Sequence, residues 1–118
     1  AVEVRLGRAL ETLPELARDG AAPFDLVFID ADKVSNAEYL DWAIRLSRPG
    51  AVIVIDNVVR GGGILDESSD DPSIVGTRRL FETIRADSRV DATVLQTVGV
   101  KGYDGFVIAV VNESDPAG

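Results

Sequence analysis

Apolar and polar positions along this chain predict strands and helices in alternation. Residues 2–6 predict a short strand, and apolar positions spaced over residues 10–17 predict a helix. Phe24–Ile29 is an almost continuous apolar run, typical of a parallel strand that is covered on both faces. A second helical stripe occupies residues 39–46, and residues 51–55 predict another buried strand. The first half of the chain therefore predicts repeated strand and helix units.

Local signals indicate where two of the helices begin. Ser35 and Glu38 have the spacing of a capping box, in which both side chains bond free amides of the first helical turn. Asp71 followed by Pro72 is expected to cap and open a later helix, whose apolar stripe runs over residues 75–84.

The end of the chain completes the expected fold. Residues 92–97 and 106–111 predict two strands, and their short connection suits an antiparallel hairpin. Residues 61–71 mix glycines with acids and have no period, so we interpret them as a mobile loop. Residues 1–118 are thus expected to form a single α/β domain, a three-layer sandwich with a mostly parallel sheet and a C-terminal antiparallel hairpin.

Composition limits the chemistry that such a domain can perform. The 118 residues are 46% hydrophobic and 27% charged, which suits one small globular domain rather than two. The sequence has no Cys and no His, which excludes disulfides, thiolate nucleophiles and the commonest general base. Catalysis would therefore depend on carboxylates, Lys, Tyr, hydroxyls or a hard cation held by oxygens.

Charge and the ends of the sequence bear on partners and location. The formal net charge of −8 opposes binding to nucleic acid or to an anionic membrane surface. No apolar run is long enough to span a membrane, and the start lacks a signal-type stretch, so we expect a soluble, cytoplasmic protein. The sequence has no Met and starts within an expected strand, so we also expect it to be part of a longer protein.

Two successive strands are followed by acidic residues. Asp30, Asp32 and Lys33 come after the first buried strand, and Asp56 and Asn57 come after the second. The carboxyl ends of parallel strands meet at one edge of a sheet, where ligands bind. These oxygens could hold Mg²⁺ or Ca²⁺, and a nearby cation would favour a neutral Lys33 that acts as a general base. An Asp at a strand end is also a common loop former or helix cap, so the pattern alone leaves both interpretations open.

Other conspicuous residues have ordinary interpretations. Trp42 lies on a helical stripe and is expected in the core or at an interface. The acids of residues 66–71 fit a solvated loop better than a second metal site. The glycines at 61–63 lack the lysine and the spacing of a phosphate-binding loop, which excludes that motif.

The sequence resembles a known family at these strand ends. The matching segments are FDLVFIDADK at residues 24–33, LSRPG at 46–50, VIDNV at 54–58 and YDG at 103–105. Together they are similar to the cation-dependent O-methyltransferases, the group of catechol and caffeoyl-CoA O-methyltransferases. The resemblance covers nearly the whole chain and implies a Rossmann-like methyltransferase fold.

The resemblance implies a role for each residue at the strand ends. Asp30, Asp56 and Asn57 would be the ligands of Mg²⁺, or of Ca²⁺ or Mn²⁺ in its place. Lys33 would be the catalytic base that accepts a proton from a phenolic hydroxyl, whose oxygen then attacks the methyl group of S-adenosylmethionine. This chemistry agrees with the oxygen-rich site that the residues themselves suggest.

The resemblance also implies contacts for the cofactor and the substrate. Ala9, Asp30 and Asp32 match positions that border S-adenosylmethionine in the family. Arg60 matches a position that contacts the substrate, which would be a small catechol-like phenol. We further expect a homodimer.

The family's sheet order is 3-2-1-4-5-7-6, which assigns residues 2–6 to strand 3 and the later strands to 4, 5, 7 and 6. The family's glycine-rich cofactor loop precedes all of these residues, so the chain is expected to be the C-terminal part of a methyltransferase domain. Phe24–Ile29 would then have an unpaired edge.

Two other classes of function compete with a methyltransferase. The chain could be a non-catalytic α/β binding or dimerisation module without a complete cofactor site. A phosphoacceptor receiver domain would need an early acidic pair and a Lys-Pro near its end, whereas Lys101 is followed by Gly102. A strand and a glycine-rich turn encoded upstream of Ala1 would favour the enzyme.

Overall fold

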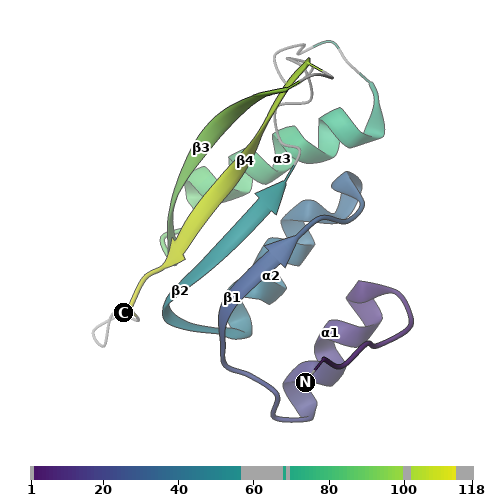
Figure 1. The fold of residues 1–118 in the computed structure, drawn as a ribbon, viewed down its shortest axis with the longest axis vertical. Coiled ribbons are helices and arrows are strands. Elements are labelled where there is room, and N and C mark those ends of the chain that lie inside the picture. Colours follow the sequence, from purple (N-terminus) through teal and green to yellow (C-terminus); the bar gives the residue numbers. More distant parts are fainter. Residues whose placement is uncertain (1, 57–67, 69, 100–101, 114–118) are drawn as a thin grey trace.

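The computed structural model describes residues 2–56, 68, 70–99 and 102–113 (Figure 1). They form three α-helices, one short 3₁₀ helix and four strands. In chain order these are α1 (Ala9–Arg18), β1 (Phe24–Ile29), the 3₁₀ helix η1 (Lys33–Ser35), α2 (Asn36–Arg45), β2 (Ser47–Asp56), α3 (Pro72–Ala86), β3 (Val90–Gly99) and β4 (Gly102–Val111). The predicted order of strands and helices from residue 9 onward is confirmed.

The four strands form one sheet in the order β1-β2-β4-β3. β1 and β2 are parallel, whereas β4 is antiparallel to both β2 and β3. This order is the 4-5-7-6 order that the resemblance implied, and the closing hairpin is confirmed. β1 and β3 are the two edge strands of the described sheet.

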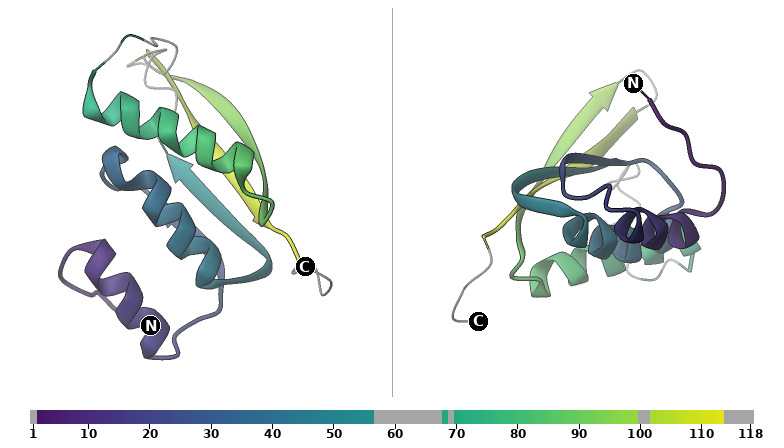
Figure 2. Two further views of the ribbon diagram at one scale, coloured as in Figure 1. Left: turned by 180° about the vertical axis from the view of Figure 1, so that it is seen from behind. Right: turned by 90° about the horizontal axis from the view of Figure 1, so that it is seen from below.

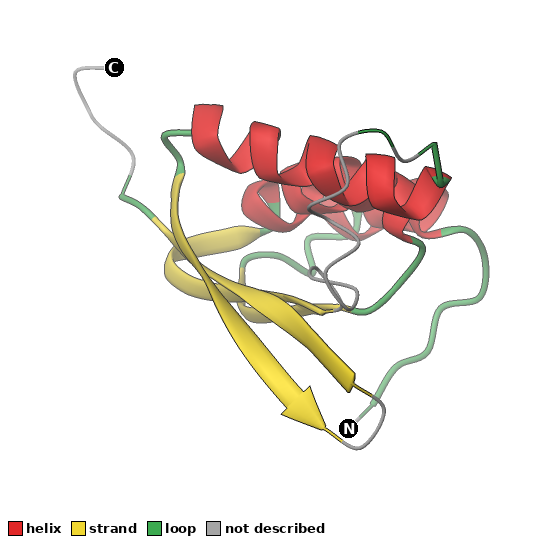
Figure 3. Ribbon diagram, turned by 90° about the horizontal axis from the view of Figure 1, so that it is seen from above, coloured by secondary structure: helices red, strands yellow, loops and turns green. Residues whose placement is uncertain are grey.

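The described helices lie on one face of the sheet, as Figures 2 and 3 show. The described part of the chain therefore has two of the three layers expected for a Rossmann-like sandwich, and one of its three strand pairings is parallel. None of the helices in the described ranges has both the length and the apolar composition that crossing a membrane requires.

The core lies between the sheet and the helices α2 and α3. Ile53 and Ile55 of β2 are fully buried, and they cluster with Leu40 of α2, Leu80 of α3 and Val107 of β4. Burying each of these side chains contributes about 1.5–3 kcal/mol to stability. Trp42 is only half-buried, and its ring lies 5.0 Å from the Arg45 guanidinium carbon. β2 is thus held by packing as well as by pairing on both sides.

The apolar strand β1 is covered by described residues on only one of its two faces. Val27 and Ile29 pack against the core, while Leu26 and Phe28 alternate to the other face and are 64% and 61% exposed. The continuous apolar run correctly predicted the strand, but the expected cover on both faces is not present in the described residues. The predicted unpaired edge at β1 is confirmed.

The predicted strand at residues 2–6 was wrong. Residues 2–6 form no strand, and Val2, Val4 and Leu6 are exposed. The physical reason is that a strand needs a neighbour for its backbone hydrogen bonds, and the described sheet offers none at that position. The predicted loop at residues 61–71 lies mostly outside the described residues.

The capping box was also wrong, although the helix start was right. Ser35 occupies the N-cap of α2, but its side chain makes no capping hydrogen bond. η1 directly precedes α2, so the Ser35 amide instead donates to Asp32 Oδ2 at 3.2 Å. Glu38 pairs with Arg79 of α3 at 2.8 Å. At α3 the prediction holds, because Asp71 accepts from the Ser73 amide at 2.8 Å and Pro72 opens the helix.

The exposed edge of β1 generates a prediction about self-association. We expect residues 1–118, expressed alone, to form oligomers through β1, because an apolar strand edge is a template for pairing with another chain. Leu26→Lys should shift the population towards monomer, measured by sedimentation velocity. The control is Val75→Lys, an equally drastic change on an exposed part of α3. A wild-type chain that is monomeric and melts cooperatively would contradict the prediction.

Candidate active site at the carboxyl edge of the sheet

The parallel pairing of β1 with β2 brings two carboxylates to one edge. Their register pairs Ile29 with Ile55, so the next residues, Asp30 and Asp56, lie side by side at the carboxyl ends of the strands. This edge is where open α/β sheets bind ligands, because the strands fix the first residues of each loop. The two strand ends that precede and carry these acids thus meet at one edge of the sheet, as the parallel pairing requires.

Lys33 is buried against both strand ends. Its side chain is 7% exposed, and Nζ donates a hydrogen bond of 3.0 Å to the backbone carbonyl of Asp56. Nζ also lies 3.7 Å from Oδ1 of Asp30. A buried amine is costly unless it is hydrogen-bonded and near an opposite charge, and Lys33 has both. The residue chosen from sequence as the base is therefore held between the two strands that carry the acids.

Asp32 stabilises the start of η1 and meets a residue that the sequence analysis did not select. Besides the Ser35 amide, its carboxylate accepts a hydrogen bond from the hydroxyl of Tyr39 on α2. This hydroxyl, together with the Ser35 amide, lowers the pKa of Asp32 below its usual value, although burial opposes the shift. Burial raises the pKa of Tyr39, and the carboxylate raises it further. At neutral pH the pair is thus a charged Asp32 and a protonated Tyr39.

The sequence contained a weak signal for this pair. Tyr39 appeared only as a member of the α2 stripe, and a tyrosine on such a stripe is usually just a core residue. Tyr39 is indeed buried, but its hydroxyl reaches back seven residues to Asp32. Only the turn through η1, which connects β1 to α2, brings the two residues together.

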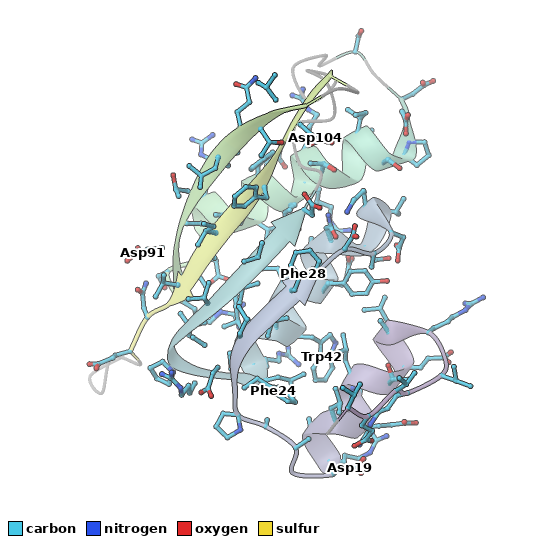
Figure 4. All side chains as sticks on the ribbon, in the orientation of Figure 1. Asp19, Phe24, Phe28, Trp42, Asp91 and Asp104 are labelled. Atoms are coloured by element: carbon cyan, nitrogen blue, oxygen red, sulfur yellow. The ribbon has the colours of Figure 1, made fainter. Side chains whose placement is uncertain are left out.

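Two neighbouring hollows surround the predicted cofactor residues. Ala9 and Asp32 line a cavity of about 570 Å³ together with Arg8, Glu11 and Tyr39. A second, mostly apolar cavity of about 450 Å³ lies between α1 and β1, and it is lined by Asp30 and again by Ala9 and Tyr39. The structure thus brings Ala9 of α1 and the distant residues Asp30 and Asp32 to adjoining walls of one hollow region. Figure 4 shows Phe24 and Phe28 on β1 at the side of this region.

The described residues fit a hard cation in their chemistry but do not complete a site for one. Asp30 and Asp56 provide carboxylate oxygens at adjacent strand ends, and oxygen donors of this kind suit Mg²⁺, Ca²⁺ or Mn²⁺. Within the described ranges, no three acidic side chains come close enough to hold a metal ion. The third predicted ligand, Asn57, and the predicted substrate residue, Arg60, lie outside the described residues.

Curated proteins that resemble this chain are named as O-methyltransferases. The chain is 54% identical over 110 residues to a catechol O-methyltransferase of Niastella koreensis and 59% identical over 110 residues to one of Mycobacterium tuberculosis. These alignments cover 93% of the chain but only 50% and 48% of the two relatives. The chain thus spans about half the length of the curated relatives it matches.

Solved structures give the same result for the fold. An O-methyltransferase from Bacillus cereus in complex with SAH superimposes with a TM-score of 0.90 at 56% identity. The tomaymycin-synthesis O-methyltransferase TomG from Streptomyces achromogenes, in complex with SAM, superimposes with a TM-score of 0.86 at 54% identity. The alignments cover 94% and 91% of this chain, and 50% and 48% of those chains.

The family model described as O-methyltransferase matches residues 1–109. Since that match covers almost the entire sequence, and since both sequence relatives and solved structures carry the same description, the chain belongs to the O-methyltransferase family.

Proposed function

We propose that this chain is part of a cation-dependent O-methyltransferase that transfers the methyl group of S-adenosylmethionine to a phenolic hydroxyl of a catechol-like molecule. The observation that carries the proposal is the buried Lys33, whose Nζ lies 3.0 Å from the Asp56 carbonyl and 3.7 Å from the Asp30 carboxylate. A base beside paired carboxylates at the ligand-binding edge of a sheet is suited to deprotonating a hydroxyl. The two relatives are both named as catechol O-methyltransferases, which supports the substrate class.

Cofactor binding is proposed at the hollow beside α1. Ala9 would border the adenine, and the carboxylates of Asp30 and Asp32 would border the rest of S-adenosylmethionine. The shared cavity walls support this assignment, as do the solved relatives in complex with SAM and SAH. Because Tyr39 and the Ser35 amide stabilise the charged form of Asp32, its carboxylate is available as a hydrogen-bond acceptor at neutral pH.

A divalent cation is proposed at Asp30, Asp56 and Asn57. Mg²⁺, Ca²⁺ or Mn²⁺ held there would lower the pKa of adjacent phenolic oxygens and orient them. The protein's own contribution is to fix the two carboxylates through the β1 and β2 register and to keep all donors oxygen-based. With no His or Cys in the sequence, softer metals have no preferred ligand here.

Lys33 would accept the phenolic proton at Nζ. S-adenosylmethionine bound beside it would supply the methyl group, which the phenolic oxygen would take while the sulfur keeps the electron pair of the broken carbon–sulfur bond. The Asp56 carbonyl orients the amine by accepting one of its hydrogens.

The proposal extends to the substrate contact, the assembly and the location of the protein. Arg60 would contact the substrate, the protein would be a cytoplasmic homodimer, and its partner would be a small phenol rather than nucleic acid or membrane. The net charge of −8 supports the last point, because it repels polyanions.

The proposed cation site predicts that activity requires a divalent metal. In the full-length enzyme, EDTA should abolish turnover and added Mg²⁺ should restore it, measured by formation of S-adenosylhomocysteine. Asp56→Ala should raise the Mg²⁺ concentration for half-maximal activity by about 100-fold or more, because a ligand is lost. The control is Asp91→Ala on β3, the strand at the other edge of the sheet (Figure 4). Turnover that survives EDTA would refute the metal proposal.

The proposed base predicts a loss of kcat on substitution of Lys33. Lys33→Ala and Lys33→Met should lower kcat by ~10²–10⁴-fold with little change in KM for either substrate. Lys33→Arg should not rescue kcat, because a guanidinium stays protonated and cannot accept a proton. Lys101→Ala, at the other lysine of the sequence, is the control, and melting temperatures establish that each variant is folded. Near-normal kcat in Lys33→Arg would show that Lys33 acts through its charge and is not the base.

A further inference from the structure

The backbone of α3 passes unusually close to the residue that carries the proposed base. A Cβ atom added at Gly76 of α3 would lie 2.5 Å from the Lys33 carbonyl oxygen, 2.7 Å from Val34 Cα and 3.0 Å from the Lys33 carbonyl carbon. All three atoms belong to the backbone of η1, so no side-chain rotation can relieve the overlap. Any residue larger than glycine at position 76 must therefore displace η1 or α3.

Glycine is present here for space and not for its backbone freedom. The described glycines with positive φ are Gly7, Gly20 and Gly50, and Gly76 is not among them. A glycine inside a helix normally destabilises it relative to alanine. At an ordinary position on α3, Gly→Ala would thus be expected to stabilise the protein. At position 76 the overlap with the backbone of η1 should instead make Gly→Ala destabilising.

A second contact holds η1 from the side of α2. Asp32, directly before η1, accepts from the Ser35 amide at the end of η1 and from the Tyr39 hydroxyl on α2. Tyr39 is buried, so its ring has a fixed position from which the hydroxyl can hold Asp32. η1 is therefore held by the backbone of α3 on one side and by the Tyr39 and Asp32 hydrogen bond on the other.

The side chain of Lys33 starts from this held segment and ends at β2. Its Nζ donates a hydrogen bond to the Asp56 carbonyl at 3.0 Å. A shift of η1 by a fraction of an ångström would therefore lengthen or weaken this hydrogen bond. We propose that Gly76 and Tyr39 are positioning residues, which act through η1 to set where the Lys33 amine lies relative to Asp30 and Asp56. The expected effect on turnover rests on the proposed function. The expected effect on the position of the Lys33 amine does not.

The test compares Gly76→Ala with Leu80→Ala in the full-length enzyme. Leu80 is fully buried on the same helix, so its truncation loosens α3 without adding volume near η1. Gly76→Ala should lower kcat by about 10²-fold, the cost of misplacing a reacting group by about 1 Å, and change KM for S-adenosylmethionine much less. Leu80→Ala should lower the melting temperature but keep kcat, measured where both variants are folded.

The second readout does not depend on activity. With ¹³C-labelled lysine, the ε-methylene NMR signal of Lys33, assigned by its loss in Lys33→Arg, should shift in Gly76→Ala and stay in place in Leu80→Ala. Tyr39→Phe, which removes only the hydroxyl group and keeps the buried ring, should shift the same signal and lower kcat by about tenfold. If Gly76→Ala does not fold, the result for Tyr39→Phe decides the test.

The proposal requires both changes together. A folded Gly76→Ala enzyme that keeps the parental signal, or that shifts it without losing kcat, overturns the inference, and Tyr39→Phe is judged by the same two criteria. Full activity in Lys33→Ala would instead refute the proposed base. In that case the NMR signal alone decides whether α3 and Tyr39 position Lys33.

Discussion

The hydrogen bond from Lys33 Nζ to the backbone carbonyl of Asp56 connects η1 to the end of β2, the two elements that carry the proposed site. It joins residues 23 positions apart, and it is formed by a side chain that is 7% exposed. A buried amine requires such a partner, so η1 must lie where the side chain can reach the end of β2. The paired register of β1 and β2, the cap at Asp32 and the close approach of α3 all serve that requirement.

The sheet determines what the site can contain. Because β1 and β2 are parallel and adjacent, the acids that follow them share one edge, and the hydrogen-bonded register fixes their spacing more rigidly than two loops could. The antiparallel β4 on the other side of β2 leaves this edge intact while burying Ile53 and Ile55. The core therefore fixes the strand that carries Asp56, and the proposed site lies at the carboxyl end of that strand.

The helices contribute in unequal ways. α1 supplies Ala9 to the wall of the hollow, and α2 supplies Tyr39, which keeps the pKa of Asp32 low. α3 supplies no reactive group from its described residues, yet Gly76 lets its backbone touch that of Lys33. Helix stability and the position of Lys33 are coupled at that contact, because a residue that improved the helix would displace the backbone of Lys33, the proposed base.

The sequence by itself determined most of the helices and strands, and it supplied the residues of the proposed site. The bounds of β1, the start of α3 at Asp71 and Pro72, and the closing hairpin follow from local patterns, since apolar spacing and caps act within a few residues. The resemblance added the strand order. Tertiary structure alone decided that residues 2–6 remain unpaired and that the Ser35 amide bonds Asp32, the N-cap of η1. It alone also decided that Tyr39 meets Asp32 and that Gly76 contacts Lys33. Each of these features depends on contacts between residues that are distant in sequence, or on the absence of such a contact. Patterns that span only a few residues do not contain this information.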